Sequence, residues 1–301
     1  AFANGPSGSI RIPLNKVVTM QVVHTKAQLR AVLKQARAGG RRVGFVPTMG
    51  YLHAGHAALI HRARQENEVV VVSVFINPTQ FGPNEDLAAY PRNTERDIAL
   101  MRAQGADVAF FPSVDEIYPE GFTTYVQVEG PMTQTLCGRS RPGHFRGVAT
   151  IVTKLFHIVA PDRAYFGQKD CQQVAVIERM VRDLDFDLEI VACPTVREAD
   201  GLALSSRNVY LSESQRAQAP RIAQALFEAR EMIQKGERRA APLVEYIKKC
   251  IAAIDSAAID YVSIADLRSL ADLEMLSGVV LIAVAVKVGR TRLIDNIRVE
   301  V

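Results

Sequence analysis

The chain has 301 residues, 48% of them hydrophobic and 23% charged, which is typical of a globular protein with one large or two modest domains. The net charge is only +4 and the Lys and Arg residues are dispersed, so no nucleic-acid partner is expected. The longest uninterrupted apolar run, residues 279–286, is too short to span a bilayer, so no membrane partner is expected either.

The cysteines are far apart and form no Cys-x-x-Cys pair, which predicts free thiols in a reducing, cytoplasmic compartment, with neither a disulfide nor a zinc knuckle. They are Cys137, Cys171, Cys193 and Cys250. Residues 1–19 include a Gly-, Pro- and Ser-rich stretch. We expect this segment to be a cloning remnant or a flexible extension outside the fold.

After Met20, apolar residues at helical spacing predict a helix that ends at Gly39 and Gly40. A β-branched and aromatic run at 43–46 then predicts a strand, followed by a tight turn. Helical spacing of apolar residues returns beyond the turn and continues to Glu66. This part of the chain is therefore predicted to be a strand, a turn and a helix.

Two histidines, His53 and His56, stand at the expected start of that helix, where residues three apart share one face. Free backbone N–H groups and the helix dipole favour an anion there, and Gly50 and Gly55 would let a bulky anion approach the backbone. The preceding strand and turn favour a phosphate site with two imidazole donors. Two alternatives stay open: an exposed polar helix start, or a metal-ligand pair that needs further ligands.

Residues 69–76 form a continuous apolar run, as expected for a parallel strand covered on both faces. Asn77 and Gln80 follow its carboxyl end, where open parallel sheets bind ligands, although Asn77 could also simply form a turn. A helix at 93–104 and a strand at 108–111 come next. The alternation of strands and helices predicts an α/β fold, a doubly wound parallel sheet. Neither Gly-x-Gly-x-x-Gly nor a P-loop is present.

A Gly- and Arg-rich segment at 137–147 is expected to be a loop that leads into a helix at 148–159. Four of its side chains either face an anionic ligand or form a solvated basic loop. They are Arg139, Arg141, His144 and Arg146.

A strand at 163–166 and a helix at 171–183 form a second strand-to-helix junction, where Lys169 is well placed for a phosphate. The last strand of this sheet is predicted at 188–193, and a linker at 195–201. A third polar cluster follows, and it either cradles phosphate oxygens or is an ordinary Ser-rich turn. It consists of Ser205, Ser206 and Arg207.

The rest of the chain, residues 196–301, is predicted to form a smaller α+β domain. It follows a Rossmann-like domain predicted at 20–195. Its predicted helices are 214–234 and 243–253, and its predicted strands are 259–264, 279–288 and 291–297. A hairpin turn is expected at Gly289 and Arg290.

Five motifs occur in order and together closely resemble the pantothenate synthetase (pantoate-β-alanine ligase) family of the nucleotidyltransferase superfamily. They lie at residues 47–56, 75–82, 141–147, 166–173 and 204–208. The resemblance covers essentially the whole chain from Met20 onward. It implies that ATP drives the condensation of pantoate with β-alanine through pantoyl adenylate, a step toward coenzyme A. It also implies Mg²⁺, a cytoplasmic homodimer, a Rossmann-like N-terminal domain and a C-terminal lid.

The resemblance also implies roles for individual residues. His53, His56, Lys169, Ser205, Ser206 and Arg207 would act on the phosphates, with His56 as the proton donor, and Asp170 would bind the ribose. The ATP site as a whole would comprise Met49, Gly50, Tyr51, Leu52, His53, Ala54, Gly55, His56, Gly167, Gln168, Lys169, Asp170, Val196, Leu204, Ser205, Ser206 and Arg207.

The resemblance further implies which residues bind the other substrates. Gln80 and Gln173 would hold pantoate, with Gln80 also bordering β-alanine and Asn77 as a supporting donor. Asp97 is the candidate Mg²⁺ ligand. The chain departs from the commoner family pattern at Gln168, Cys171 and Leu204, where many relatives have Glu, Tyr and Met. These positions contribute mainly backbone or packing, so we expect the activity to be kept.

Other interpretations stay open from the sequence. Another nucleotidyltransferase would share the two histidines but would not explain Gln80 and Gln173, and a tRNA-charging enzyme would normally be longer. A catalytically silent nucleotide-binding regulator predicts ATP binding without turnover. A metal-dependent hydrolase would use His53, His56 and His144.

Overall fold

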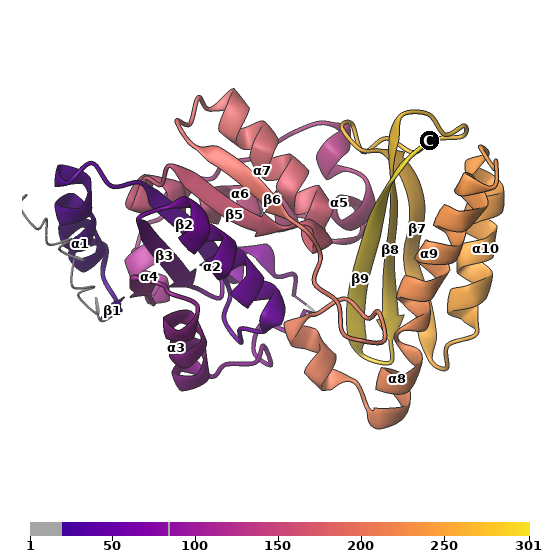
Figure 1. The fold of residues 1–301 in the computed structure, drawn as a ribbon, viewed down its shortest axis with the longest axis horizontal. Helices are drawn as coiled ribbons and strands as arrows, with labels where there is room; N and C mark the ends of the chain where they lie inside the picture. Colours follow the sequence, from indigo (N-terminus) through magenta and orange to yellow (C-terminus); the bar gives the residue numbers. More distant parts are fainter. Residues whose placement is uncertain (1–19, 84) are drawn as a thin grey trace, which may run out of the picture.

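The computed structural model describes residues 20–83 and 85–301, and it contains two β-sheets side by side (Figure 1). The prediction for residues 1–19 lies outside the described residues. In the part of the chain that is described, no helix is long and apolar enough to cross a bilayer. All four cysteines are free thiols.

Within these residues the larger sheet has six parallel strands in the order β1-β4-β3-β2-β5-β6. The strands are β1 (Gln21–Val23), β2 (Val43–Thr48), β3 (Val69–Val74), β4 (Val108–Phe110), β5 (Arg163–Gly167) and β6 (Glu189–Cys193). The order reverses between β2 and β5, and such a switch point is where open α/β sheets bind their ligands.

Helices cover both faces of this sheet, which confirms the doubly wound fold. Apolar side chains of α1 (Lys26–Ala38), α6 (His144–Val159) and α7 (Cys171–Asp183) form one core against the sheet. Those of α2 (Ala54–Glu66) and α3 (Thr94–Ala103) form a second core on the opposite face. Two covered faces explain why every residue of β3 except Ser73 is apolar.

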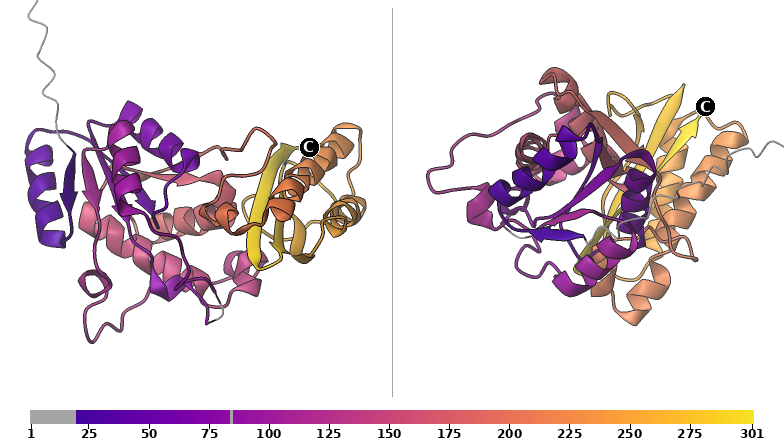
Figure 2. Two further views of the ribbon diagram at one scale, coloured as in Figure 1. Left: turned by 90° about the horizontal axis from the view of Figure 1, so that it is seen from below. Right: turned by 60° about the vertical axis from the view of Figure 1, so that its left-hand side comes forward.

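The smaller sheet is antiparallel and contains β7 (Ala257–Asp266), β8 (Val279–Val288) and β9 (Thr291–Glu300). Helices α9 (Arg221–Gln234) and α10 (Ala240–Ala252) cover one of its faces (Figure 2).

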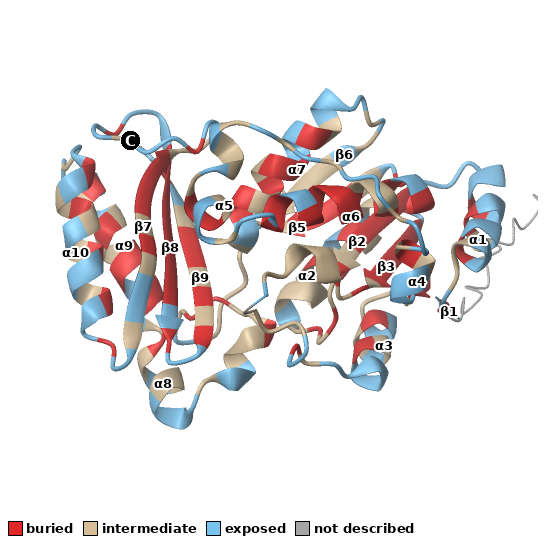
Figure 3. Ribbon diagram, turned by 180° about the vertical axis from the view of Figure 1, so that it is seen from behind, coloured by how far each residue is buried: buried red, intermediate tan, exposed pale blue. Residues whose placement is uncertain are grey.

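The opposite face of this sheet packs against the larger unit. Alternate residues of β8 divide between the two sides: Ile282 and Val284 belong to the core under the helices, and Leu281 and Ala283 to the core of the larger unit. Because both sides are covered, β8 is almost entirely buried (Figure 3). The α+β architecture is as predicted, whereas the boundary between 195 and 196 stays a prediction.

Three predictions of elements were incomplete. Strand β1 was not predicted, because three residues are too short to show an alternating pattern. The helix predicted at 214–234 is two helices, α8 (Glu213–Gln218) and α9, because Pro220 has no N–H and its ring disfavours a continuous helix. The basic segment at 137–147 is only partly a loop, since it holds most of α5 (Leu136–Ser140) and the start of α6.

Candidate active site

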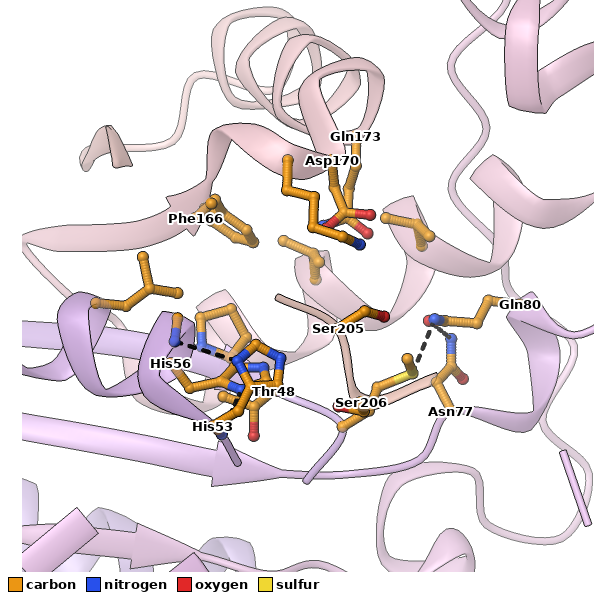
Figure 4. Close-up of a pocket in the computed structure, with 18 of the residues that line it drawn as sticks. Thr48, His53, His56, Asn77, Gln80, Phe166, Asp170, Gln173, Ser205 and Ser206 are labelled. Atoms are coloured by element: carbon orange, nitrogen blue, oxygen red, sulfur yellow. Dashed lines mark hydrogen bonds between the residues drawn. The ribbon is translucent and has the colours of Figure 1, made fainter. Parts of the chain in front are cut away.

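A cavity of about 240 Å³ lies at the switch point, beyond the carboxyl ends of β2, β3 and β5 (Figure 4). It brings together residues from all five sequence motifs. The predicted site residues that line it are Met49, His53, Gly55, His56, Asn77, Gln80, Gly167, Lys169, Asp170, Gln173, Val196, Leu204, Ser205, Ser206 and Arg207. The predicted residues that do not line it are Gly50, Tyr51, Leu52, Ala54, Gln168 and Asp97.

The turn after β2 is held by Asp97 from α3. Gly50 and Tyr51 have φ values of +86° and +51°. Glycine adopts positive φ readily, whereas Tyr51 is strained there and must be held by contacts with other residues. The buried Asp97 carboxylate accepts hydrogen bonds from the N–H groups of Tyr51 (2.8 Å) and Leu52 (2.7 Å). Burial raises the pKa of Asp97, and these two bonds oppose that effect. Both carboxylate oxygens are therefore used to shape the turn, which does not suit the predicted role in metal binding.

No group of three or more His, Cys, Asp or Glu side chains within residues 20–83 and 85–301 is arranged to hold a metal ion. His144 could not join His53 and His56 without breaking contacts of its own. One of its ring nitrogens lies 3.0 Å from Arg141 Nη1 and the other 2.9 Å from the Gln80 carbonyl oxygen. The three histidines of the hydrolase interpretation are therefore not three free ligands.

His53 and His56 cap the start of α2. His53 is the N-cap, and its Nδ1 accepts from the Gly55 N–H (3.1 Å), while His56 Nδ1 accepts from the His53 N–H (3.3 Å). A neutral imidazole that accepts at Nδ1 carries its proton at Nε2. Both rings can therefore present an Nε2–H donor, and their centroids are 4.1 Å apart.

The structure gives a different reason for a glycine at position 55 from the anion approach expected from the sequence. A Cβ at this position would lie 2.9 Å from Cε1 of the His53 ring. The glycine thus makes room for the capping imidazole. By contrast, a Cβ at Gly167 would meet no atom within 4 Å, so the backbone there borders open space.

Both histidines are neutral at pH 7. Burial, followed by the charge of Lys169, lowers the pKa of His53 to about 4. Burial, followed by His53 and Lys169, lowers the pKa of His56 well below its usual range. The pair therefore acts as hydrogen-bond donors that add no positive charge to the site.

This depressed pKa predicts a stability effect at acid pH. The unfolded chain binds a proton at His53 near pH 6.5 and the folded chain only near pH 4, so the free energy of unfolding should fall as pH falls through that window. We expect His53→Asn, which keeps an N-cap oxygen, to reduce the fall. Urea unfolding at pH 7.0 and 4.5 measures it, and an equal fall in both proteins would contradict the assignment.

The turn η3 (Gln168–Asp170) joins β5 to α7 and carries Lys169 and Asp170. Asp170 and Gln173 extend into the cavity from this side, across from the histidines (Figure 4). Lys169 forms no ion pair with any residue that the structure describes. Its ammonium group is therefore available to an anionic ligand.

Gln80 is fixed at both its side chain and its backbone. The buried Asn77 amide donates to Gln80 Oε1 (3.0 Å) and to the carbonyl oxygen of Gly147 (3.1 Å). Because Gln80 Oε1 accepts, its Nε2 points along the cavity, 3.1 Å from Met49 Sδ. The carbonyl of Gln80 faces His144 Nδ1 at 2.9 Å. Asn77 thus supports Gln80, and its own amide hydrogens are already used.

Two of the four predicted basic residues of 137–147 reach the cavity, namely Arg141 and His144. Arg139 does not line it, and Arg146 lies over the Tyr125 ring, 3.9 Å from its centroid. A guanidinium can only donate, so Nε2 of His144 accepts from Arg141 and Nδ1–H donates to Gln80. The basic segment therefore acts on Gln80 through His144.

The acidic partners of the site arginines were missed by the sequence analysis. Arg141 donates to both carboxylate oxygens of Glu85 (2.6 and 2.7 Å), and Arg207 to both of Asp86 (2.8 and 2.8 Å). Burial raises the pKa of Glu85, but the hydrogen bond and charge of Arg141 lower it to about 2. Arg207 is thus ion-paired, although it lines the cavity as predicted. Adjacent acidic residues in a loop carry no sequence signal for their distant arginines.

Known proteins match this chain over nearly its whole length. Residues 21–298 match the family model described as pantoate-β-alanine ligase. The pantothenate synthetases of Acetivibrio thermocellus and Moorella thermoacetica are 56% and 57% identical over 282 residues, which cover 94% of this chain and 100% and 99% of those proteins.

Solved structures agree with this match. Pantothenate synthetase from Thermus thermophilus is 51% identical, with a TM-score of 0.88 over 92% of this chain and 99% of that chain. Pantoate-β-alanine ligase from Francisella tularensis, solved with "Beta-gamma ATP" and β-alanine, is 34% identical, with a TM-score of 0.76 over 92% and 97%. A family match over nearly the full length, together with a shared fold, shows that the chain belongs to the pantoate-β-alanine ligase family.

Proposed function

We propose that this protein condenses (R)-pantoate with β-alanine, using ATP, to give pantothenate, AMP and diphosphate. The observation that carries the proposal is that one cavity combines imidazole and ammonium donors for phosphates with two glutamines for a hydroxy acid. The family match and the relative solved with an ATP compound and β-alanine support it. A transferase that acts on a phosphorylated alcohol would have less use for Gln80 and Gln173.

A carboxylate is a poor electrophile, so it must be activated before it can be joined to an amine. In the proposed first step an oxygen of pantoate's carboxylate attacks the α-phosphorus of ATP. The bond from that phosphorus to the bridging oxygen breaks, and diphosphate leaves with the electron pair. Pantoyl adenylate is then the bound intermediate.

Negative charge grows on the phosphoryl and diphosphate oxygens during this step. Donors fixed in advance toward those oxygens lower the barrier, because they need not reorganise as the charge moves. His53 and His56 would each donate a hydrogen bond through Nε2–H. We assign the proton-donor role that the resemblance implies for His56 to this hydrogen bond. Lys169 would add a full charge, and Ser205 would add a hydroxyl donor. Ser206 Oγ already donates to the Tyr51 carbonyl oxygen (3.3 Å), so it would have to exchange that partner for a phosphate oxygen.

Arg207 would reach the phosphates only by sharing or exchanging its Asp86 partner. Asp170 is proposed to bind the ribose. Gln80 and Gln173 would hold pantoate with its carboxylate toward the α-phosphorus, and Asn77 would support Gln80. These assignments use the donors that the cavity offers and need no protein nucleophile.

In the second step the neutral amine of β-alanine attacks the acyl carbon, AMP leaves with the electron pair of the acyl–oxygen bond, and the nitrogen releases one proton to give the amide. A reactive adenylate must be kept from water until the amine arrives. We propose that the smaller sheet and its helices close over the site by bending near Pro194, which lines the cavity.

Mg²⁺ is proposed as part of the nucleotide substrate, held mainly by ATP phosphate oxygens and water. Mg²⁺ commonly binds through substrate phosphates and few protein carboxylates. This fits the lack of a metal-binding cluster among the described residues. Since Asp97 already accepts two backbone hydrogen bonds, we assign it to the turn and route no step through it.

We also propose that the protein is a cytoplasmic homodimer, as its family resemblance implies. Its four free cysteines fit a reducing compartment. Light scattering of the purified protein tests the dimer, with a monomer mass as the contrary result.

The proposed reaction predicts that pantoate, ATP and Mg²⁺ release diphosphate before β-alanine is added. Adding β-alanine should then release AMP and pantothenate in equal amounts. Both can be followed in one experiment with a coupled diphosphate assay and chromatography of the products. ATP binding without pantoate-dependent diphosphate release would instead favour a sister transferase or a silent regulator.

A further inference from the structure

Two adjacent polar residues are buried in β9. Asp295 is 4% exposed and Asn296 5%, in a strand where neighbouring side chains normally alternate between faces. Asp and Asn are both depleted in strands, and a buried polar side chain is costly unless it is hydrogen-bonded. Their presence side by side therefore calls for specific partners.

The partners of Asn296 belong to the ATP side of the candidate active site. Its Nδ2 donates to the carbonyl oxygens of Gln168 (3.0 Å) and Lys169 (2.8 Å). These carbonyls belong to η3, immediately before α7 begins at Cys171. Both amide hydrogens of Asn296 are thus spent on the segment from which Lys169 extends into the cavity.

The partners of Asp295 belong to the second ATP segment. Its carboxylate accepts from both terminal nitrogens of Arg197 (2.6 and 2.9 Å), and Arg197 also donates to the Gly201 carbonyl (3.0 Å). Val196 precedes this arginine, and its carbonyl accepts from the Leu204 N–H (3.0 Å). Asp295 therefore fixes the hairpin from which Val196 and Leu204 reach the cavity.

We propose that Asn296 is a positioning residue for adenylate formation, which holds the Lys169 backbone so that its ammonium group meets the ATP phosphates. Asp295 fixes the neighbouring segment through Arg197. One strand of the smaller sheet, β9, thus positions both segments of the ATP site. The inference rests on the proposed function only for the identity of the reaction. Its physical basis is that a small misplacement of a charged donor is costly in rate.

Two variants at position 296 separate shape from charge. Asn296→Asp keeps the shape but loses the amide donors, and Asn296→Leu loses them without adding charge. We expect both to lower the rate of pantoate-dependent diphosphate release by about 10- to 100-fold. The KM for pantoate and the reaction of preformed pantoyl adenylate with β-alanine should change far less, because Lys169 acts on phosphates.

A double variant distinguishes positioning from general weakening. If Asn296 acts through Lys169, adding Asn296→Leu to Lys169→Ala should slow diphosphate release no further. Losses that multiply in the double variant would overturn the proposal, and so would equal slowing of both half-reactions.

Ser263→Ala is the matched control, because it removes a buried hydrogen bond of the same sheet, to Asp272 (2.6 Å), away from the ATP segments. It should leave the rate of diphosphate release unchanged. If the unaltered protein releases no diphosphate with pantoate, the proposed function fails, and the affinity for ATP measured by calorimetry still decides this inference. Asn296→Leu should then weaken ATP binding only when Lys169 is present, and an equal loss in its absence would overturn the inference.

Discussion

Replacing Lys169 by alanine is expected to slow the formation of pantoyl adenylate by about 100- to 1000-fold, the usual effect of removing one preorganised donor from a developing anion. Lys169 lines the cavity and has no ion-pair partner among the residues described, so its charge is not already neutralised. The neutral histidines beside it add no charge that could take its place.

The loss should be confined largely to the first half-reaction. Diphosphate leaves in that step, whereas the attack of β-alanine on the adenylate involves no triphosphate. Rapid-quench measurement of diphosphate release, beside the reaction of preformed pantoyl adenylate with β-alanine, gives the two rates separately. Equal loss in both would contradict the assignment of Lys169 to the triphosphate.

Lys169→Met separates the charge from the side-chain stem, because methionine keeps an unbranched chain without the ammonium group. It should be nearly as slow as Lys169→Ala. Lys249→Met, on the exposed side of α10, is the matched control and should retain the full rate. His56→Ala should also affect mainly the first step, and it additionally removes an acceptor for the His53 N–H.

Apart from β1, the local order of the larger sheet could be predicted from sequence, because the other strands and the helices between them carry their own signals. Buried parallel strands such as β3 are apolar at every position but Ser73, and helices such as α1 combine apolar spacing with a clear end at Gly39. Parallel strands end at one edge of a sheet, so residues after them could be expected to meet. His53, Gln80 and Lys169 do line one cavity.

What could not be predicted are contacts between segments far apart in the chain. Glu85 has nothing in its sequence neighbourhood that points to Arg141, and Asn296 nothing that points to Lys169. The first pair depends on how two segments of the larger unit meet, and the second on the packing of the smaller sheet against that unit. No periodicity encodes either contact. The local signal was a weak one: Asp295 and Asn296 are two adjacent polar residues between Ile294 and Ile297 of the strand.

Asp97 shows the opposite case, in which the folded surroundings favour a different role from the one that the sequence predicted. A carboxylate near an expected phosphate site is a reasonable metal candidate from sequence alone. The turn has positive φ at Gly50 and Tyr51, and its N–H groups at Tyr51 and Leu52 need acceptors, which only the folded structure reveals. The hydrogen bonds that the turn requires thus explain why this carboxylate is buried, without a metal ion.

Gly147 is the position where adding a single methyl group should damage pantoate binding most. A Cβ there would lie 2.3 Å from the Thr79 carbonyl oxygen and 2.6 Å from Gln80 Cα, and both are backbone atoms that cannot rotate away. Gly147→Ala must therefore push the turn that carries Gln80 away from α6. The Gly147 carbonyl would lose its bond from Asn77 in the same movement.

We expect this variant to lower kcat/KM for pantoate by about 100-fold, because a displacement near 1 Å at a substrate-positioning group has an effect of that size. The affinity for ATP should change little, since the histidines and Lys169 lie on other segments. The free energy of unfolding should fall by about 1–3 kcal/mol from overpacking. Pantoate saturation curves, calorimetry with ATP and urea unfolding measure these three quantities.

Two further variants keep this prediction testable even if Gly147→Ala folds poorly. Asn77→Asp removes both donors to Gln80 Oε1 and the Gly147 carbonyl without changing size, so it should raise the KM for pantoate in the same direction. Gly39→Ala, whose Cβ would meet no atom closer than 3.5 Å, controls for the substitution itself. Unchanged pantoate kinetics in both Gly147→Ala and Asn77→Asp would show that Gln80 does not need this support, because the same contact is weakened from either side.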